Sequence, residues 1–282
     1  MRLSMRTKDK IKGILVYTTI IVIIFVHLIP IYWTASTAFK YLEDVYNMPP
    51  EWIPKRPTLD AYVRVFVSRP LFHWVWNTMV LSGAVTFLTV VVSALAAYSI
   101  SRFRFPGSQY ASLMIIATRF IPPMATTVPI FLMYQALGIY NTMIGLVLIL
   151  TFLQLPFRIW LLNAFFESIP WDLEEMGMID GCTRVGAFFR IIIPISLPAF
   201  SAVGILTFIG TWNSFYWPLV LTQGAENKVL SLGIYDFIGD TMIFTNELCA
   251  GGIIMSIPSF LFVIFASKYM IRGLTAGALK GL

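Results

Sequence analysis

The sequence predicts an all-α, polytopic membrane protein with six transmembrane helices, because it carries few charges, long apolar runs and an uneven distribution of basic residues. Only 12% of its 282 residues are charged and 58% are hydrophobic, whereas a soluble domain is about 25% charged. A soluble core helix would also show a polar stripe. Four runs contain no Asp, Glu, Lys or Arg and reach the roughly 20 residues that span a bilayer; they cover 13–39, 70–101, 120–157 and 191–225.

We expect a single transmembrane domain over 1–282. The first apolar run is too long for the hydrophobic part of a signal peptide and no small-x-small cleavage pattern follows it, so we take it as a retained span. The expected spans lie at about 13–38, 74–100, 109–135, 142–165, 198–222 and 248–271. The parts of the domain are the N-terminal span 13–38, the core spans within 74–271, a cytoplasmic loop at 166–197 and a C-terminal tail at 272–282.

Basic residues set the expected orientation. Arginine and lysine concentrate on the cytoplasmic side of membrane proteins, which places both termini and the loop 166–197 in the cytoplasm. Six basic residues fall outside, and Arg119 falls within the third span. The thirteen assigned to the cytoplasmic side are Arg2, Arg6, Lys8, Lys10, Lys12, Arg102, Arg104, Arg158, Arg184, Arg190, Lys268, Arg272 and Lys280. Membrane orientation accounts for the net charge of +6, so we expect no nucleic-acid partner.

The loop 166–197 is predicted to form two short helices that dock a protein. Pro170 suits the first turn of a helix, Gly181 suits its left-handed end, and Thr183 suits the N-cap of a second helix. The first helix is acidic, which fits a basic protein partner better than an anionic lipid surface, the alternative for an amphipathic helix. Its acids are Asp172, Glu174 and Glu175, and the expected buried side of the second helix is Val185, Phe188, Phe189 and Ile192.

Part of this loop resembles the EAA motif, E-A-A-x3-G-x9-I-x-L-P, of the inner-membrane permeases of binding-protein-dependent ABC importers. Met176 and Gly177 replace the two alanines, and Ile193 replaces the leucine. The matching positions are Glu175, Gly181, Ile191 and Pro194. Flanking segments resemble the carbohydrate branch of that family, the class of the smaller permease of the maltose transporter. They are AAYSISRFRFPG at 96–107, FESIPWDLEE at 166–175, TWNSFYWPLVLT at 211–222 and GLTAGALKG at 273–281.

The resemblance implies a type I ABC importer permease (MetI-like) fold in a bacterial or archaeal plasma or inner membrane. The chain would form half of a sugar pathway and pair with a second permease as a heterodimer. Two ATPase subunits, an extracytoplasmic sugar-binding protein, the sugar and membrane lipid would be its other partners. The chain itself would hold no cofactor and would not be an enzyme, because ATP and Mg²⁺ would bind to the ATPases.

The resemblance also assigns residues to ATPase coupling, since the EAA loop of the family docks into an ATPase cleft. The C-terminal tail resembles one that reaches toward the ATPases, with a disordered polar end as the alternative. The expected coupling residues are Glu174, Glu175, Gly177, Asp180, Gly181 and Pro194. The expected tail contacts are Gly273, Leu274, Thr275 and Gly277.

Several polar and aromatic residues in the spans are candidates for the translocation path. A charged side chain such as that of Arg119 costs free energy at membrane depth. It would contact a sugar hydroxyl, or it would pair structurally with a carboxylate or a free carbonyl. Aromatic rings stack on sugars and amides bond to hydroxyls, but such residues also join helices or lie in the interfacial belt. The other candidates are Gln154, Trp160, Trp212, Asn213 and Tyr216.

Other functions are weaker hypotheses. An ion-coupled secondary transporter or channel, acting without ATPase partners, usually carries an acid at mid-membrane, and no acid here lies clearly mid-span. An intramembrane hydrolase would need a nucleophile motif such as G-x-S-x-G, which is absent. Gly181 and Gly186 have phosphate-loop spacing, but no strand precedes them and the lysine is missing. We predict no catalytic residue and no metal site.

Overall fold

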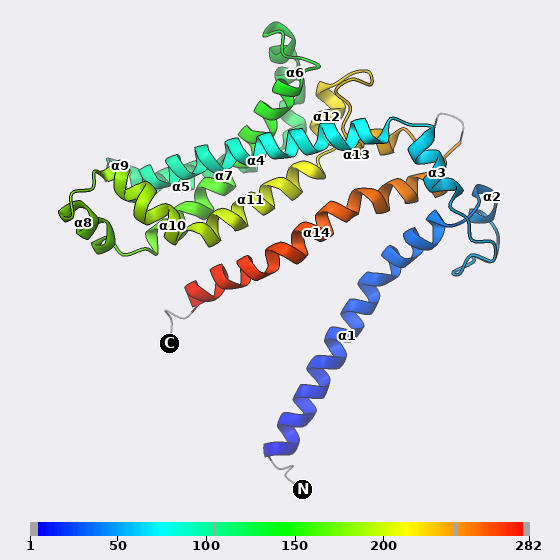
Figure 1. The fold of residues 1–282 in the computed structure, drawn as a ribbon, viewed down its shortest axis with the longest axis horizontal. Coiled ribbons are helices and arrows are strands. Elements are labelled where there is room, and N and C mark those ends of the chain that lie inside the picture. Colours follow the sequence, from blue (N-terminus) through cyan, green and yellow to red (C-terminus); the bar gives the residue numbers. More distant parts are fainter. Residues whose placement is uncertain (1–4, 104, 240–241, 279–282) are drawn as a thin grey trace. The chain divides into compact units, whose positions relative to one another are not determined.

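The computed structural model describes the backbone of residues 5–103, 105–239 and 242–278 (Figure 1). Side chains are described for 12–103, 105–108, 110–239 and 242–264. Its regular elements are helices, apart from one isolated bridge between Ile238 and Ile243, so the predicted all-α class is confirmed for this part of the chain. The residues form two compact units, 1–70 with 234–256 and 71–233 with 257–282. The single domain over 1–282 stays a prediction.

The first unit contains the N-terminal helix and the loop that follows it. Lys40 organises this loop: its Nζ donates to the Glu51 carbonyl at 2.5 Å and lies 4.3 Å from the Trp33 ring centroid. Arg56 lies 2.7 Å from Asp44, which raises the pKa of the guanidinium. The helices of this unit are α1 (Met5–Ala38), α2 (Leu42–Val45), α3 (Asp60–Val67) and the first part of α14 (Thr245–Ala278).

The second unit is a bundle whose centre is formed by three long helices. α4 (Leu71–Arg102), α7 (Met143–Glu167) and α11 (Leu197–Trp212) pack on one another; Figure 1 shows α11 running beside α4. The remaining elements are α5 (Ser108–Ala117), η1 (Thr118–Phe120), η2 (Pro123–Thr126), α6 (Thr127–Ala136), α8 (Asp172–Ile179), α9 (Arg184–Ala187), η3 (Phe188–Ile192), α10 (Ile193–Ile195) and α12 (Tyr216–Leu221). α13 (Leu230–Tyr235) lies at the boundary of the two units.

Four helices of the described residues are long and apolar enough to cross a membrane, and six spans result if each of two bent helix pairs is counted as one. The four correspond to the first, second, fourth and sixth predicted spans. The third predicted span bends by 82° between Phe120 and Pro123, where Pro122 cannot continue a helix. The fifth predicted span, 198–222, differs more from the structure. Its helix ends at Trp212, and the helical segment that bends against it is Arg184–Ile195, at an angle of 75°.

A buried cluster of apolar side chains lies beneath the loop 166–197. It joins Ala97 and Tyr98 of α4 to Phe166 of α7, Phe188 of η3 and Val203 of α11. Close van der Waals packing of this kind is what holds helices together within a membrane. The short helices of the loop are therefore packed on the long helices of the same unit, which positions the loop.

Candidate functional site

The first helix of the loop, α8, ends in a complete Schellman motif. The Cys182 N–H donates to the Gly177 carbonyl at 3.0 Å, and the Gly181 N–H donates to the Met178 carbonyl at 3.1 Å. Gly181 has φ = +89°, a left-handed conformation that suits glycine. The predicted role of Gly181 as the turn residue after this helix is confirmed.

The second helix begins where the sequence predicts. The Thr183 hydroxyl accepts a hydrogen bond from the Gly186 N–H at 3.0 Å, as an N-cap does. Phe188 and Ile192 are buried as expected. Val185 and Phe189 are exposed, so their predicted burial is wrong: α9 and η3 contact the rest of the unit over a narrower face than the periodicity indicates.

Gly177 permits a close approach between α8 and the following helix. A Cβ atom at this position would overlap Cδ1 of Ile191. Gly177 is buried, whereas Pro194 lies exposed in α10. Of these two predicted coupling residues, Gly177 acts within this chain as a packing residue.

Glu174 anchors α8 to the cytoplasmic end predicted for α4. Its Oε1 accepts from Arg102 Nε at 2.5 Å, and its Oε2 accepts from the Tyr98 hydroxyl at 2.8 Å. Arg102 also donates from Nη2 to the Ile169 carbonyl at 3.0 Å and lies over the Trp171 ring. Both charged side chains are almost fully buried. Since breaking a buried, hydrogen-bonded ion pair costs about 3–5 kcal/mol, this cluster fixes α8 to α4.

Glu174 is 4% exposed and directs its carboxylate into this cluster, so other side chains form the outer face of α8, and a coupling role for Glu174 stays a prediction. The outer face of α8 and its C-cap instead carries three exposed acids and two exposed apolar side chains. They are Asp172, Glu175, Met176, Ile179 and Asp180. Such an uncovered mixture of apolar and acidic side chains is typical of an interaction surface rather than of a solvated helix face.

The two tryptophans predicted for the translocation path lie in different environments. Trp212 is 1% exposed and stacks on Phe208 at 5.9 Å between ring centroids. Its ring therefore packs inside the unit, as the helix-joining alternative predicts, and a path role for Trp212 stays a prediction. Trp160 is 40% exposed and stacks on Phe157 at 5.8 Å, so its ring remains available at the surface of the unit.

Two other predicted path residues make local polar contacts. Asn213 donates to the Ile209 carbonyl at 2.9 Å and to the Ser259 hydroxyl at 3.4 Å. The Tyr216 hydroxyl is hydrogen-bonded to the Thr127 hydroxyl. Both pairs join separate helices of the unit, and a path role for either residue stays a prediction.

Gln154 belongs to a polar cluster between α7 and α11 that the sequence does not predict. Arg158 donates from Nε to the Thr207 hydroxyl at 2.9 Å and from Nη2 to Gln154 Oε1 at 3.1 Å. Gln154 Nε2 donates to the Thr211 hydroxyl at 2.7 Å. The distribution of basic residues predicts Arg158 on the cytoplasmic side, but it lies within α7 and is 8% exposed. Arg158 lies four residues after Gln154, which puts both side chains on one face of a helix. This spacing is the sequence signal from which the cluster could be predicted.

The predicted tail contacts lie at the end of α14. Gly273, Leu274, Thr275 and Gly277 are helical, and their side chains fall outside the described part of the chain. Contact of this segment with an ATPase stays a prediction.

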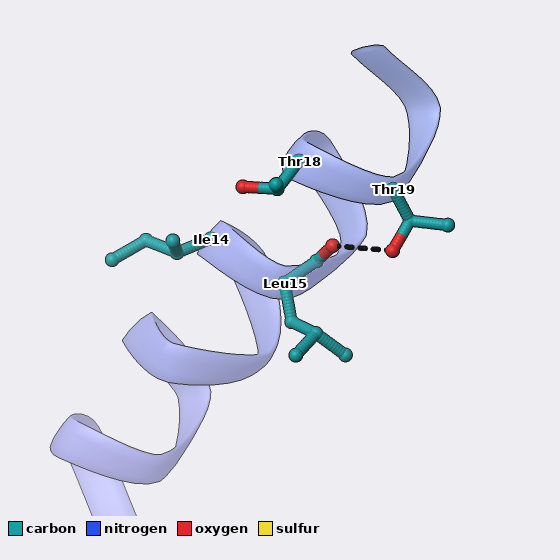
Figure 2. A pocket seen from close by; sticks show the side chains of 4 residues that line it. All are labelled: Ile14, Leu15, Thr18 and Thr19. Carbon is teal, nitrogen blue, oxygen red and sulfur yellow. Dashed lines mark hydrogen bonds between the residues drawn. The ribbon is translucent and has the colours of Figure 1, made fainter. Parts of the chain in front are cut away.

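A shallow hollow on α1 carries no chemistry. Ile14, Leu15, Thr18 and Thr19 line it, and all four come from a single helix (Figure 2). The Thr19 hydroxyl is bonded to the Leu15 carbonyl at 2.8 Å, which leaves a mostly apolar surface. This hollow is the ordinary relief of a helix that is not covered by its own chain.

Comparison with known proteins gives one family. A family profile described as the binding-protein-dependent transport system inner membrane component matches residues 89–275. The chain is 33% identical to the sulfoquinovosyl glycerol transport system permease protein SmoH of Agrobacterium fabrum, over 90% of this chain and 89% of that protein. It is 31% identical to the trehalose/maltose transport system permease protein MalG of Thermococcus litoralis, over 97% of this chain and 99% of that protein.

The fold also matches a solved structure. A chain of a bacterial ABC transporter involved in the import of the acidic polysaccharide alginate superposes with a TM-score of 0.77 at 23% identity, over 95% of this chain and 99% of that chain. This likeness confirms the predicted MetI-like, type I importer permease fold.

Proposed function

Because the chain belongs to the family of binding-protein-dependent transport system inner membrane components, we propose that it is one of two permease subunits of an ATP-driven sugar importer. It would form half of the translocation pathway in a multi-pass arrangement, with both termini in the cytoplasm of a bacterium or archaeon. Membrane lipid would surround the heterodimer.

The observation that carries the coupling role is the anchored outer face of α8. The ion pair between Glu174 Oε1 and Arg102 Nε, which lie 2.5 Å apart, holds this helix on α4. A force applied to α8 therefore reaches a long helix of the bundle. Glu175 and Asp180 remain exposed on it beside Ile179, which is 84% exposed. A partner with a basic rim and an apolar cleft would bury this face.

We infer that this partner is a pair of ATPase subunits, which would hold ATP and Mg²⁺. The chain offers no phosphate-binding loop, so hydrolysis would occur on those subunits and closure of the ATPase pair would move α8. An extracytoplasmic binding protein would deliver the sugar on the opposite side of the membrane.

The substrate class follows from the relatives. SmoH and MalG are described as permeases for sulfoquinovosyl glycerol and for trehalose or maltose, and a trehalose permease SugB of Mycobacterium tuberculosis is 32% identical over 90% of this chain and 93% of that protein. We propose a mono- or oligosaccharide substrate for this chain.

Reconstitution tests the proposal. The chain, the second permease, the ATPases and the binding protein are placed in proteoliposomes, and uptake of a radiolabelled sugar panel is measured with ATP, with a non-hydrolysable ATP analogue, or with a proton or sodium gradient. We expect uptake with ATP alone and only in the presence of the binding protein. Uptake driven by either ion gradient without ATP contradicts the proposal and favours the ion-coupled carrier.

A further inference from the structure

The cluster around Arg158 places a positive charge deep in the second unit. Arg158 lies three residues beyond Leu155, the midpoint of α7 (Met143–Glu167). At 1.5 Å per residue it is about 4.5 Å along the axis from the centre of the helix. The hydrocarbon core of a bilayer is about 30 Å thick, so a spanning α7 puts the guanidinium near the middle of the membrane. An ionised side chain there is costly and usually serves a function.

The described neighbours of Arg158 satisfy part of its hydrogen bonding and one of them, Phe157, places its ring centroid 5.3 Å from the guanidinium, but none carries an opposite charge. Thr207 and Gln154 accept from Nε and Nη2, but a hydroxyl and an amide are neutral. A guanidinium has five N–H groups. Three of them, on Nη1 and Nη2, have no hydrogen-bond partner among the described residues, and none of the ion pairs found there includes Arg158. The free edge of the fork suits the two oxygens of a carboxylate or sulfonate.

A second cation reinforces the positive charge. Arg119 is exposed on η1 (Thr118–Phe120), which packs on α7, and none of the described ion pairs includes it. The described acids of this unit lie at helix ends or in loops, far along the sequence from the middle of α7. They are Glu167, Asp172, Glu174, Glu175, Asp180 and Glu226. Neither arginine therefore has a counter-ion among the described residues of this unit.

We propose that Arg158, supported by Gln154 and Arg119, binds the carboxylate or sulfonate of an acidic saccharide as it passes through the membrane. This inference rests on the proposed function and names the substrate class: an anionic rather than a neutral sugar. Gln154 is half-buried and would also reach a sugar hydroxyl. A fixed carboxylate of the second permease is the competing source of the counter-ion, and the rescue experiment below separates the two.

The test uses the assembled importer with its own binding protein in proteoliposomes. Binding of digalacturonate and of neutral galactobiose to the binding protein is measured first, within a panel of acidic and neutral mono- to tetrasaccharides. ATP-dependent uptake of the bound sugars then follows for the unmodified importer, Arg158→Lys and Arg158→Gln. Arg158→Lys keeps the charge, and Arg158→Gln keeps a hydrogen-bonding side chain without it.

We expect the binding protein to prefer acidic saccharides and Arg158→Gln to lower their uptake about tenfold to a hundredfold, as the loss of hydrogen bonds to a charged group does. Arg158→Lys should retain more uptake of acidic saccharides than Arg158→Gln when equal amounts of assembled importer are compared. A binding protein that takes only neutral sugars overturns the inference, as does unchanged acidic uptake by Arg158→Gln. Equal losses in both variants with reduced complex yield would show a helix-bridging role only.

Two further outcomes separate the alternatives. Rescue of Arg158→Gln by neutralising an acid in the second permease would identify a fixed partner and contradict substrate binding. If the unmodified importer takes up neither acidic nor neutral sugar with ATP, the proposed function itself fails. Neutral uptake alone leaves the proposed function intact and removes this inference.

Discussion

Arg102 donates from Nε to Glu174 Oε1 at 2.5 Å, and this bond joins the last residue of α4 to the first turn of α8. The two side chains are separated by 72 residues in the sequence. With the Tyr98 hydroxyl on the other carboxylate oxygen at 2.8 Å, Glu174 is held from two sides. The helix that we propose to contact the ATPase is thus fixed to the bundle by an internal ion pair.

Reversing one charge of this pair should uncouple the helix. Glu174→Arg and Arg102→Glu each leave two like charges in a buried site, and we expect destabilisation of about 3–5 kcal/mol with loss of uptake. The double variant, Glu174→Arg with Arg102→Glu, should regain part of the stability and part of the uptake. Thermal unfolding of the purified importer and ATP-dependent uptake measure this. A single variant with normal stability and uptake would contradict the anchoring role.

Replacement of Gly181 should damage the turn after α8. Because its φ is +89°, a branched side chain such as that of Gly181→Val strains the backbone by about 1–2 kcal/mol, whereas Gly181→Asn tolerates this region better. Uptake and sugar-stimulated ATP hydrolysis should fall more in Gly181→Val than in Gly181→Asn. Equal activity of the two variants would show that the left-handed turn is not needed.

Gly177 and Ile191 should show coupled effects. A larger side chain at position 177 meets Cδ1 of Ile191, so Gly177→Val should lower stability by about 1–3 kcal/mol, as overpacking does. Ile191→Ala removes the obstructing atom and should restore part of the loss in the double variant. The melting temperatures of the unmodified protein, the two single variants and the double variant form a double-mutant cycle. Strict additivity would show that the two residues do not contact each other.

Trp212→Ala should act on stability rather than on selectivity. The indole is buried and stacked on Phe208, and its truncation should cost about 3–5 kcal/mol. The ratio of uptake rates for two transported sugars should stay constant. Trp160→Ala, which removes an exposed ring, is the matched comparison. A changed ratio for Trp212→Ala would return this residue to the pathway.

The sequence predicted most of the fold because apolar length and turn chemistry are local signals. Gly181 and Thr183 predicted the turn and the cap between α8 and α9. Each of these features depends on a few adjacent residues. The turn at Gly181 and the cap at Thr183 are confirmed.

The site was predicted less completely, since it depends on distant partners. Glu174 and Glu175 are adjacent and acidic, and nothing local tells which one turns inward; Arg102 of α4 decides it. The distribution of basic residues predicts Arg158 on the cytoplasmic side because a count of charges ignores their depth in the membrane. The burial of Trp212 depends on packing within the bundle, which aromatic character alone does not reveal.

Photo-crosslinking from α8 tests the central claim most directly. A photoreactive amino acid at Ile179, which is 84% exposed, is compared in the assembled importer with one at Ile53, which is exposed on the opposite side of the membrane by prediction. We expect an ATPase adduct from position 179 and none from position 53, with the adduct reduced by Glu175→Arg and Asp180→Arg but not by Glu226→Arg. An active importer in which position 179 yields no ATPase adduct would contradict docking through α8.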